Sequence, residues 1–226
     1  LRDSAAMKAD DTIKNGARLI LLADFIESNI SLEEMLFQGA ANKIGEENGF
    51  SYMIKNHNVG NRISGYGDIN INVSGSAISL IDEEFLKNPP KPQEGDYLIA
   101  IRGKPNPRSN GITSKRKTME GIFEANWHET KEGSIFLPFL AEPSTIFYGL
   151  FRKLIDEKLA TSVNHLSGGA YNGKLARPLA KEKLYAEITN LFPADWRELA
   201  IAGFNLTPAE IVYGQWPMGN EGFATV

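Results

Sequence analysis

The stretch Gly95–Lys117, GDYLIAIRGKPNPRSNGITSKRK, predicts a strand, a loop and a helix in succession. Its apolar run Tyr97–Ile101 is typical of a strand, and the glycines and prolines that follow interrupt regular structure. The loop ends in Ser109–Gly111 and runs into a basic segment that includes Arg116. Hydroxyl, amide and backbone N–H groups beside cations suit an anionic ligand such as phosphate. The alternative is a solvated turn before a surface helix.

Upstream of this stretch, residues 68–81 show the clearest alternation in the chain. An apolar row alternates with a small polar row, namely Ile69, Ile71, Val73 and Ala77 against Asn70, Asn72, Ser74 and Ser76. Period-two alternation predicts a strand with one packed face and one polar face. The polar row could face a subunit partner or a ligand, with solvent as the default.

Before residue 68 the pattern predicts alternating helices and strands. Small and apolar residues spaced for one helix face occupy positions 5–13, and Gly16 supplies the helix end. Ser31 and Glu34 form a capping-box pattern for a helix to about Glu47. The residues expected to face inward from that helix are Leu32, Met35, Leu36 and Ile44, and strands are expected at Arg18–Phe25 and Phe50–Ile54.

The rest of the chain continues this alternation and suggests two domains. The expected elements are a helix from Pro143, strands at Thr161–His165 and Leu184–Ile188, helices at Ala194–Ala202 and Thr207–Tyr213, and a final strand from Gly222. The proline-rich segment Leu86–Gly95 reads as a linker between domains 1–88 and 89–226. We therefore predict an α/β (α+β) fold with mixed or antiparallel sheets and helices packed on one face.

Composition excludes several classes of protein. With 24 basic and 28 acidic residues the net charge is −4, which argues against general binding of nucleic acid or a membrane surface. The absence of cysteine rules out disulfides, thiolate metal sites and cysteine nucleophiles. The apolar run Leu19–Ile26 is too short to cross a membrane and contains Asp24. We expect a cytoplasmic protein.

The segment Gly168–Lys174, GGAYNGK, has the glycine and lysine spacing of a P-loop. Leu175 stands where a P-loop needs a hydroxyl for magnesium, and Pro178 falls within the helix that should follow. A glycine turn that brings backbone close to a phosphate stays open. His165, just before the turn, could hold the turn in place or contact a ligand.

Asp10 and Asp11 lie on the first predicted helix. Adjacent helical residues point about 100° apart, so the two carboxylates do not form a natural bidentate site. The sequence alone favours two surface residues, although one of them could reach magnesium-bound phosphate oxygens.

Separated pieces of the chain follow the order of motifs in one family. Ala6-Met7, Asp10-Asp11 and Gly16-Ala17 stand in place of its Ala-Met, Asn-Asp and Gly-Ala. Gly95–Lys117 matches its Gly-Asp-x-Leu-Ile, loop, Ser-Asn-Gly and basic helix, and His165–Ala170 matches its His-Ile-Thr-Gly-Gly-Gly. Weaker echoes are Leu140–Thr145 and Met218–Gly222. The chain thereby resembles phosphoribosylformylglycinamidine cyclo-ligase, also called aminoimidazole ribonucleotide synthetase or PurM.

This resemblance implies a two-domain PurM-like homodimer that uses ATP and Mg²⁺. Domain 1–88 would be a partial N-terminal nucleotide and dimerisation domain, and domain 89–226 the substrate and phosphate domain. The family phosphorylates the amide oxygen of a small-molecule nucleotide substrate, formylglycinamidine ribonucleotide. An internal nitrogen then attacks, expels phosphate and closes the ring of aminoimidazole ribonucleotide. Such chemistry depends on cations and oriented N–H groups around moving phosphates.

The resemblance also implies which residues form the site. The catalytic residues would be His165 and Asp11, and Asp11 would also help hold the metal. The substrate- and phosphate-binding residues would be Ser109, Asn110, Gly111, Arg116, Gly168 and Gly169.

Departures from the family pattern keep other interpretations open. The Asp-Gly-Val-Gly-Thr-Lys motif for ATP and metal is absent from this chain, which starts at Leu1, and we expect a piece of a longer polypeptide. Ile54–His57 stands where Gly-Gly-Glu-Thr is expected, and Arg108 replaces a histidine. The alternatives are another ATP-using PurM-superfamily enzyme (thiamine-monophosphate kinase, selenophosphate synthetase or hydrogenase-maturation type) and a catalytically inactive PurM-like binding module.

Overall fold

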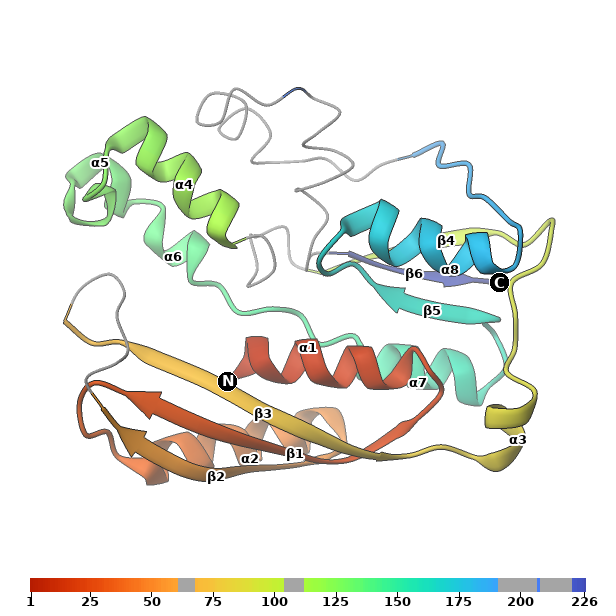
Figure 1. The fold of residues 1–226 in the computed structure, drawn as a ribbon, viewed down its shortest axis with the longest axis horizontal. Helices are drawn as coiled ribbons and strands as arrows, with labels where there is room; N and C mark the ends of the chain where they lie inside the picture. Colours follow the sequence, from red (N-terminus) through yellow and green to blue (C-terminus); the bar gives the residue numbers. More distant parts are fainter. Residues whose placement is uncertain (61–67, 104–111, 191–206, 208–220) are drawn as a thin grey trace. The chain divides into compact units, whose positions relative to one another are not determined.

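A computed structural model of the chain describes residues 1–60, 68–103, 112–190, 207 and 221–226 (Figure 1). The chain forms two compact units. Unit 1 comprises Leu1–Pro89 and Ile146–Asp156, and unit 2 comprises Pro90–Thr145 and Glu157–Val226. The sequence-based domains 1–88 and 89–226 therefore need one correction. Residues 146–156 belong to the first unit, because the helix they contain packs against the N-terminal helix.

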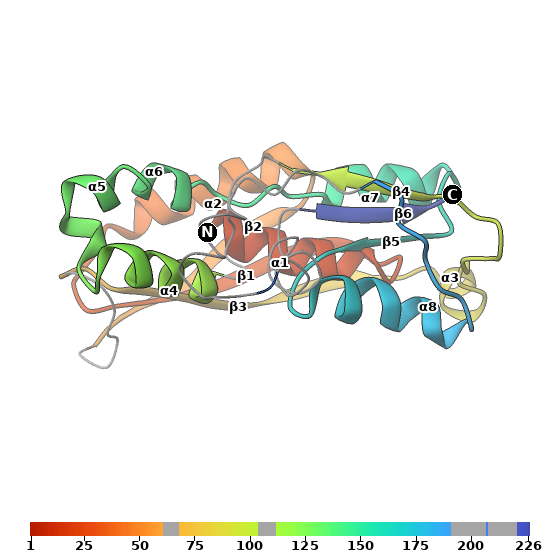
Figure 2. The same ribbon diagram turned by 90° about the horizontal axis from the view of Figure 1, so that it is seen from above.

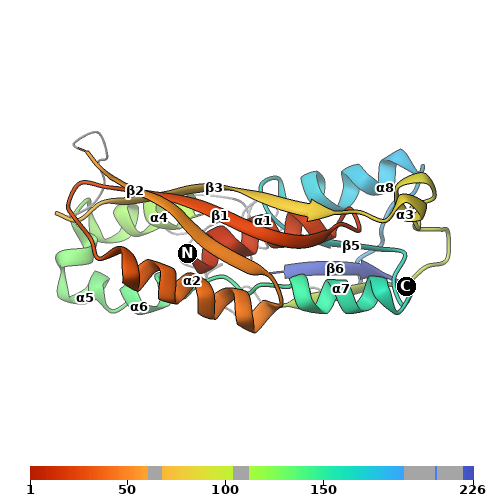
Figure 3. The ribbon, with the colours of Figure 1, turned by 90° about the horizontal axis from the view of Figure 1, so that it is seen from below.

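Unit 1 contains a mixed three-stranded sheet in the order β2-β1-β3. β1 (Arg18–Ser28) is parallel to β2 (Ser51–Val59) and antiparallel to β3 (Ile71–Leu80). A parallel pair needs a crossover connection, and helix α2 (Glu34–Asn48) supplies it and lies along β2 (Figure 3). These elements confirm the strands predicted in this part of the chain.

Helix α1 (Arg2–Ile13) packs on this sheet, over β1 and β3, and against helix α7 (Tyr148–Asp156) (Figure 2). Its buried positions include Ala5, Ala6 and Ala9, whose small side chains permit close approach to the neighbouring elements. The predicted helix end is confirmed: Gly16 has φ +76°, and a Cβ there would overlap the ring of Phe85.

The capping box predicted for α2 is wrong. The helix begins at Glu34, and its N-cap residue is Glu33 with no side-chain cap. Met35 and Leu36 were expected to face inward but are 85% and 69% exposed. The buried face of α2 contains Ala41, Ile44 and Gly45, and at 100° per residue both Met35 and Leu36 point well away from it.

The predicted alternation of β3 is present, but its apolar row is poorly covered. Val73 pairs with Ile26 and Ala77 pairs with Leu22, so both lie on the face of the sheet where β1 is buried. β3 lies at the edge of the sheet, and all of its residues except the half-buried Val73 are exposed. The expected packed face is therefore only partly formed within the described residues.

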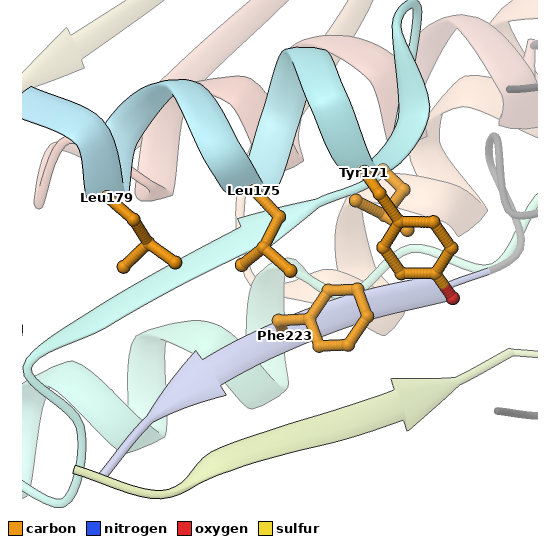
Figure 4. Packing of buried hydrophobic residues seen from close by; sticks show 5 residues of the cluster. Tyr171, Leu175, Leu179 and Phe223 are labelled. Carbon is orange, nitrogen blue, oxygen red and sulfur yellow. The ribbon is translucent and has the colours of Figure 1, made fainter. Parts of the chain in front are cut away.

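Unit 2 contains an antiparallel sheet in the order β4-β6-β5. Its strands are β4 (Leu98–Arg102), β5 (Ser162–His165) and β6 (Glu221–Thr225). The π-helix η2 (Tyr171–Ala176) continues into α8 (Arg177–Lys181), and Tyr171, Leu175 and Leu179 project from this segment towards Phe223 on β6 (Figure 4). The other helices are α3 (Glu83–Lys87) in unit 1 and α4 (Ile112–Phe123), η1 (Trp127–Glu129), α5 (Lys131–Ser134) and α6 (Leu137–Leu140) in unit 2.

The α/β (α+β) prediction with mixed and antiparallel sheets is confirmed. The strand expected at Leu184–Ile188 is absent: Leu184, Ala186 and Ile188 pack against the hydrophobic cluster of unit 2, so their alternation reports burial without strand pairing. The helix expected from Pro143 begins at Tyr148. The helices predicted at 194–202 and 207–213 lie outside the described residues, apart from position 207.

No helix in the described ranges is long and apolar enough to span a bilayer.

Candidate phosphate-binding loop and its surroundings

The loop that follows β5 holds three of the predicted site residues together. His165 ends the strand opposite Gly222 and is buried, as are Leu166 and Ser167. The chain then emerges at the exposed Gly168 and Gly169 before entering η2. The turn is closed by two backbone hydrogen bonds, from Ala170 N to Ser167 O at 2.9 Å and from Gly173 N to Gly169 O at 2.7 Å.

The two glycines of this loop are present for different reasons. Gly169 has φ +89°, and a Cβ there would lie 2.9 Å from Gly173 Cα, so both the backbone conformation and the packing require glycine. Gly168 needs no such conformation, and a Cβ there would meet no described atom within 4 Å. The fold therefore does not require glycine at position 168. Close approach of a ligand to this exposed backbone is a physical reason for a glycine there.

Ala170 follows the glycines with φ 46° and ψ −134°, a combination that a residue with a Cβ rarely adopts. It stands at the third glycine of the resembled His-Ile-Thr-Gly-Gly-Gly motif. Backbone strain of this kind is concentrated at functional loops and is maintained by the surrounding structure. Here the buried Leu166 and Tyr171 hold the segment on either side.

Of the remaining predicted site residues, the structure describes Arg116 and Asp11, which belong to different units. Arg116 is exposed on α4 and pairs with Glu120 at 3.5 Å. Asp11 lies on α1 in unit 1 and pairs with Lys14. Ser109, Asn110 and Gly111 lie outside the described residues. The structure thus brings together His165, Gly168 and Gly169, which are close in sequence.

The described part of the chain contains no ready-made cluster of magnesium ligands. Across these ranges no three histidine, aspartate or glutamate side chains gather as ligands. The ion pair of Asp11 joins it to a cation, Lys14. These residues alone do not form a magnesium centre, which needs several oxygen ligands. The assignment of Asp11 as a metal ligand stays a prediction.

Asp10 is not the surface residue that the sequence favoured. It is buried, and its Oδ1 accepts a hydrogen bond from Phe147 N at 3.0 Å. Burial raises its pKa well above the ordinary value, against the opposing effect of hydrogen bonds from the backbone of Phe147 and Tyr148. Asp10 therefore holds the beginning of α7.

A buried polar network in unit 1 was missed by the sequence interpretation. The carboxylate of Asp24 accepts hydrogen bonds from Ser4 Oγ at 2.8 Å and from Tyr52 Oη at 2.7 Å, and it forms an ion pair with Lys8. Gly75 on β3 leaves room for it, because a Cβ there would lie 2.1 Å from Asp24 Oδ1. The signal in the sequence is Asp24 itself, a carboxylate inside an apolar strand, which must find partners. The network ties α1 to the sheet.

Comparisons with known proteins give distant sequence relatives. No protein-family model matches the sequence. The chain is 25% identical over 199 residues to phosphoribosylformylglycinamidine cyclo-ligase of Streptococcus pyogenes serotype M4, a match that covers 83% of this chain and 54% of the relative. The protein of the same name from Prochlorococcus marinus is 24% identical over 180 residues, covering 77% and 51%. The chain spans about half the length of the curated relatives it matches.

Solved structures share the fold. E. coli HypE, a hydrogenase maturation protein, aligns with TM-score 0.54 and 12% identity over 100% of this chain and 64% of its own. A HypE structure in complex with ATP gives 0.52 and 13%, covering 100% and 62%. AaThiL complexed with AMPPCP and TMP gives 0.50 and 13%, covering 99% and 67%. Similarities at this identity show the fold alone. Together with the distant sequence relatives they show a PurM-like fold.

Proposed function

We propose that this chain is part of an ATP-dependent cyclo-ligase that converts formylglycinamidine ribonucleotide to aminoimidazole ribonucleotide. The two relatives of that name support this proposal, as do the solved PurM-like structures with bound nucleotides. The observation that carries it is Gly168, an exposed glycine that neither packing nor backbone conformation requires, at the place of the family's glycine loop.

The proposed chemistry needs positioning and charge stabilisation from the protein. ATP transfers its terminal phosphoryl group to the amide oxygen of the substrate. A nitrogen of the same substrate molecule attacks the activated carbon, the carbon–oxygen bond breaks, and phosphate leaves with the former amide oxygen. Backbone N–H groups near Gly168 and Gly169 would hold phosphate oxygens where charge develops.

The other site residues are assigned by proposal. Arg116 would supply a cation from α4, and the Ser109, Asn110 and Gly111 loop would contact the substrate. Asp11 would contact the nucleotide or its metal ion. His165 is buried at the base of the glycine loop. We therefore assign it to holding the loop in place, with a ring nitrogen that would reach the substrate from the buried side of the loop.

A homodimer fits the exposed face of the sheet in unit 1. Phe25, Met53 and Ile78 are 41%, 37% and 55% exposed. Strand register places them on one face of the sheet. Met53 pairs with Ala23 and Ile78 pairs with Leu21. Leu21, Ala23 and Phe25 are two residues apart along β1, so their side chains lie on the same face. Apolar side chains gathered on one sheet face favour association with another copy of the chain. Cytoplasmic location stays a prediction.

A second candidate is another ATP-using enzyme of the superfamily, and the solved HypE and ThiL structures favour keeping it. An inactive binding module is the third, because the described residues do not form a metal centre. A panel of substrates separates the three. Formylglycinamidine ribonucleotide, thiamine monophosphate and selenide are each incubated with ATP and Mg²⁺, and phosphate or nucleoside diphosphate is measured. The cyclo-ligase proposal fails if a different substrate alone supports turnover.

The Gly168→Ala variant makes the assay specific to the loop. An added methyl group would intrude between backbone and phosphate, and we expect turnover to fall by about tenfold or more. Gly149→Ala is the matched control, since Gly149 is exposed on α7 with nothing described within 4 Å of its added Cβ. Its turnover should equal that of the unmodified protein.

A further inference from the structure

Unit 1 contains a pocket of ≈ 870 Å³ that the proposed reaction does not use. It lies where β1 and β2 begin and where α2 ends, with Arg152 of α7 at its rim. Its apolar lining includes the buried Leu19, Phe50 and Tyr52. The volume falls within the range of about 300 to 1,000 Å³ that is usual for small-molecule sites.

Two arginines at this pocket share a single carboxylate. Arg18 donates to Asp156 Oδ1 at 3.3 Å, and Arg152 donates to Asp156 Oδ2 at 3.2 Å. Arg152 also donates to Tyr148 Oη at 3.4 Å. A guanidinium has five N–H donors, so both arginines keep donors that no described residue accepts. These donors are available to an anionic group in the pocket.

Carboxylates line the same pocket. Glu46 at the end of α2 and Asp82 after β3 are both exposed, and neither side-chain carboxylate forms a hydrogen bond or an ion pair with a described residue. With Asp156 the acids outnumber the two arginines, which disfavours a simple anion. A ligand that carries charges of both signs complements this rim better.

We propose that the pocket binds a small zwitterion of the amino-acid class. Its carboxylate lies against Arg18 and Arg152, and its ammonium group lies against Glu46. An apolar side chain rests on Leu19, Phe50 and Tyr52. The volume accommodates a side chain as large as an aromatic ring.

Three related probes test the charge pattern on the unmodified protein. L-Phenylalanine carries both charged groups, 3-phenylpropionate only the carboxylate, and 2-phenylethylamine only the ammonium group. Each is titrated into the isotope-labelled full chain, and amide chemical shifts are followed by NMR. We expect saturable shifts at Gly45 and Gly49, with L-phenylalanine binding at least about fivefold more tightly than either truncated probe. Equal affinity of 3-phenylpropionate and L-phenylalanine would overturn the assignment.

Variants locate the two charges. Arg152→Gln should weaken L-phenylalanine and 3-phenylpropionate by about fivefold or more and leave 2-phenylethylamine unchanged. Glu46→Gln should weaken L-phenylalanine and 2-phenylethylamine only. Arg2→Gln is the control, because Arg2 pairs with Glu47 and does not line the pocket. The proposal is wrong if no probe saturates below about 20 mM, or if Arg2→Gln and Arg152→Gln weaken L-phenylalanine equally.

Discussion

Asp10 Oδ1 on α1 accepts a hydrogen bond from the backbone N–H of Phe147, one residue before α7 begins. The two residues are 137 positions apart in sequence. An acceptor at the start of a helix satisfies an N–H group that has no partner within the helix. The segments on both sides of α7 belong to unit 2. The contact therefore anchors to unit 1 a helix whose chain neighbours lie in the other unit.

Asp10→Asn should change how stability depends on pH. Burial raises the pKa of Asp10 above its ordinary value of 3.8. The folded state therefore binds the proton more tightly than the unfolded state, and the stability that protonation provides is lost as pH rises from about 4 through the folded pKa. Asparagine keeps an acceptor for Phe147 and has no charge to bury. Urea unfolding between pH 4 and pH 8 should show the variant gaining stability relative to the parent as pH rises.

Asp10→Leu separates the hydrogen bond from the charge. It removes both, and loss of the cap should cost about 1 to 2 kcal/mol relative to Asp10→Asn. If Asp10→Asn follows the same pH profile as the parent protein, burial does not raise the pKa of this carboxyl group.

Tyr52 should make the protein sensitive to alkali. Burial raises the pKa of its phenol, and the hydrogen bond to Asp24 and the charge of that carboxylate raise it further. Stability from the protonated phenol is complete below the ordinary pKa of 10.0 and is lost as pH rises above it. Tyr52→Phe should flatten the decline in unfolding free energy between pH 9 and 11, and should cost about 1 to 3 kcal/mol at pH 7.

Tyr185→Phe provides the comparison, because Tyr185 is exposed. Its unfolding free energy at pH 7 should match that of the parent within about 0.5 kcal/mol. A Tyr52→Phe protein with an unchanged alkaline decline would show that the decline has another origin.

The two loop glycines should respond differently to alanine. Gly169→Ala forces a left-handed backbone and a contact with Gly173, and we expect a loss of about 1 to 3 kcal/mol. Gly168→Ala meets open space and should stay within about 0.5 kcal/mol of the parent. Chemical denaturation measures both. A large loss from Gly168→Ala would mean that this glycine serves the fold and would remove its value as a ligand marker.

The proposed dimer interface on the exposed sheet face of unit 1 can be tested by introducing a charge there. Ile78→Glu places a carboxylate among Phe25 and Met53, and burying it in an interface is costly. Sedimentation velocity should show a dimer for the parent and a monomer for the variant. Leu36→Glu, at an exposed position on α2, should leave the dimer intact. A parent protein that is monomeric at all concentrations contradicts the proposed interface.

Local patterns predicted part of the local structure of this chain. The helix ending at Gly16 and the alternation of β3 depend on neighbouring residues, and both are present. The partner of Asp10 could not be predicted, because Phe147 approaches only after α7 has docked. Alternation at Leu184–Ile188 resembles a strand, yet it records packing on a hydrophobic cluster. Motifs identified the glycine loop, while the distinction between Gly168 and Gly169 needed atomic positions.

Transfer of oxygen tests the proposed function most directly. Formylglycinamidine ribonucleotide labelled with ¹⁸O at the amide is incubated with ATP, Mg²⁺ and the full polypeptide. Phosphorylation of the amide oxygen followed by ring closure predicts one ¹⁸O atom in each phosphate released, with matching formation of aminoimidazole ribonucleotide. Phosphate without the label, or no phosphate from this substrate, would contradict the proposal.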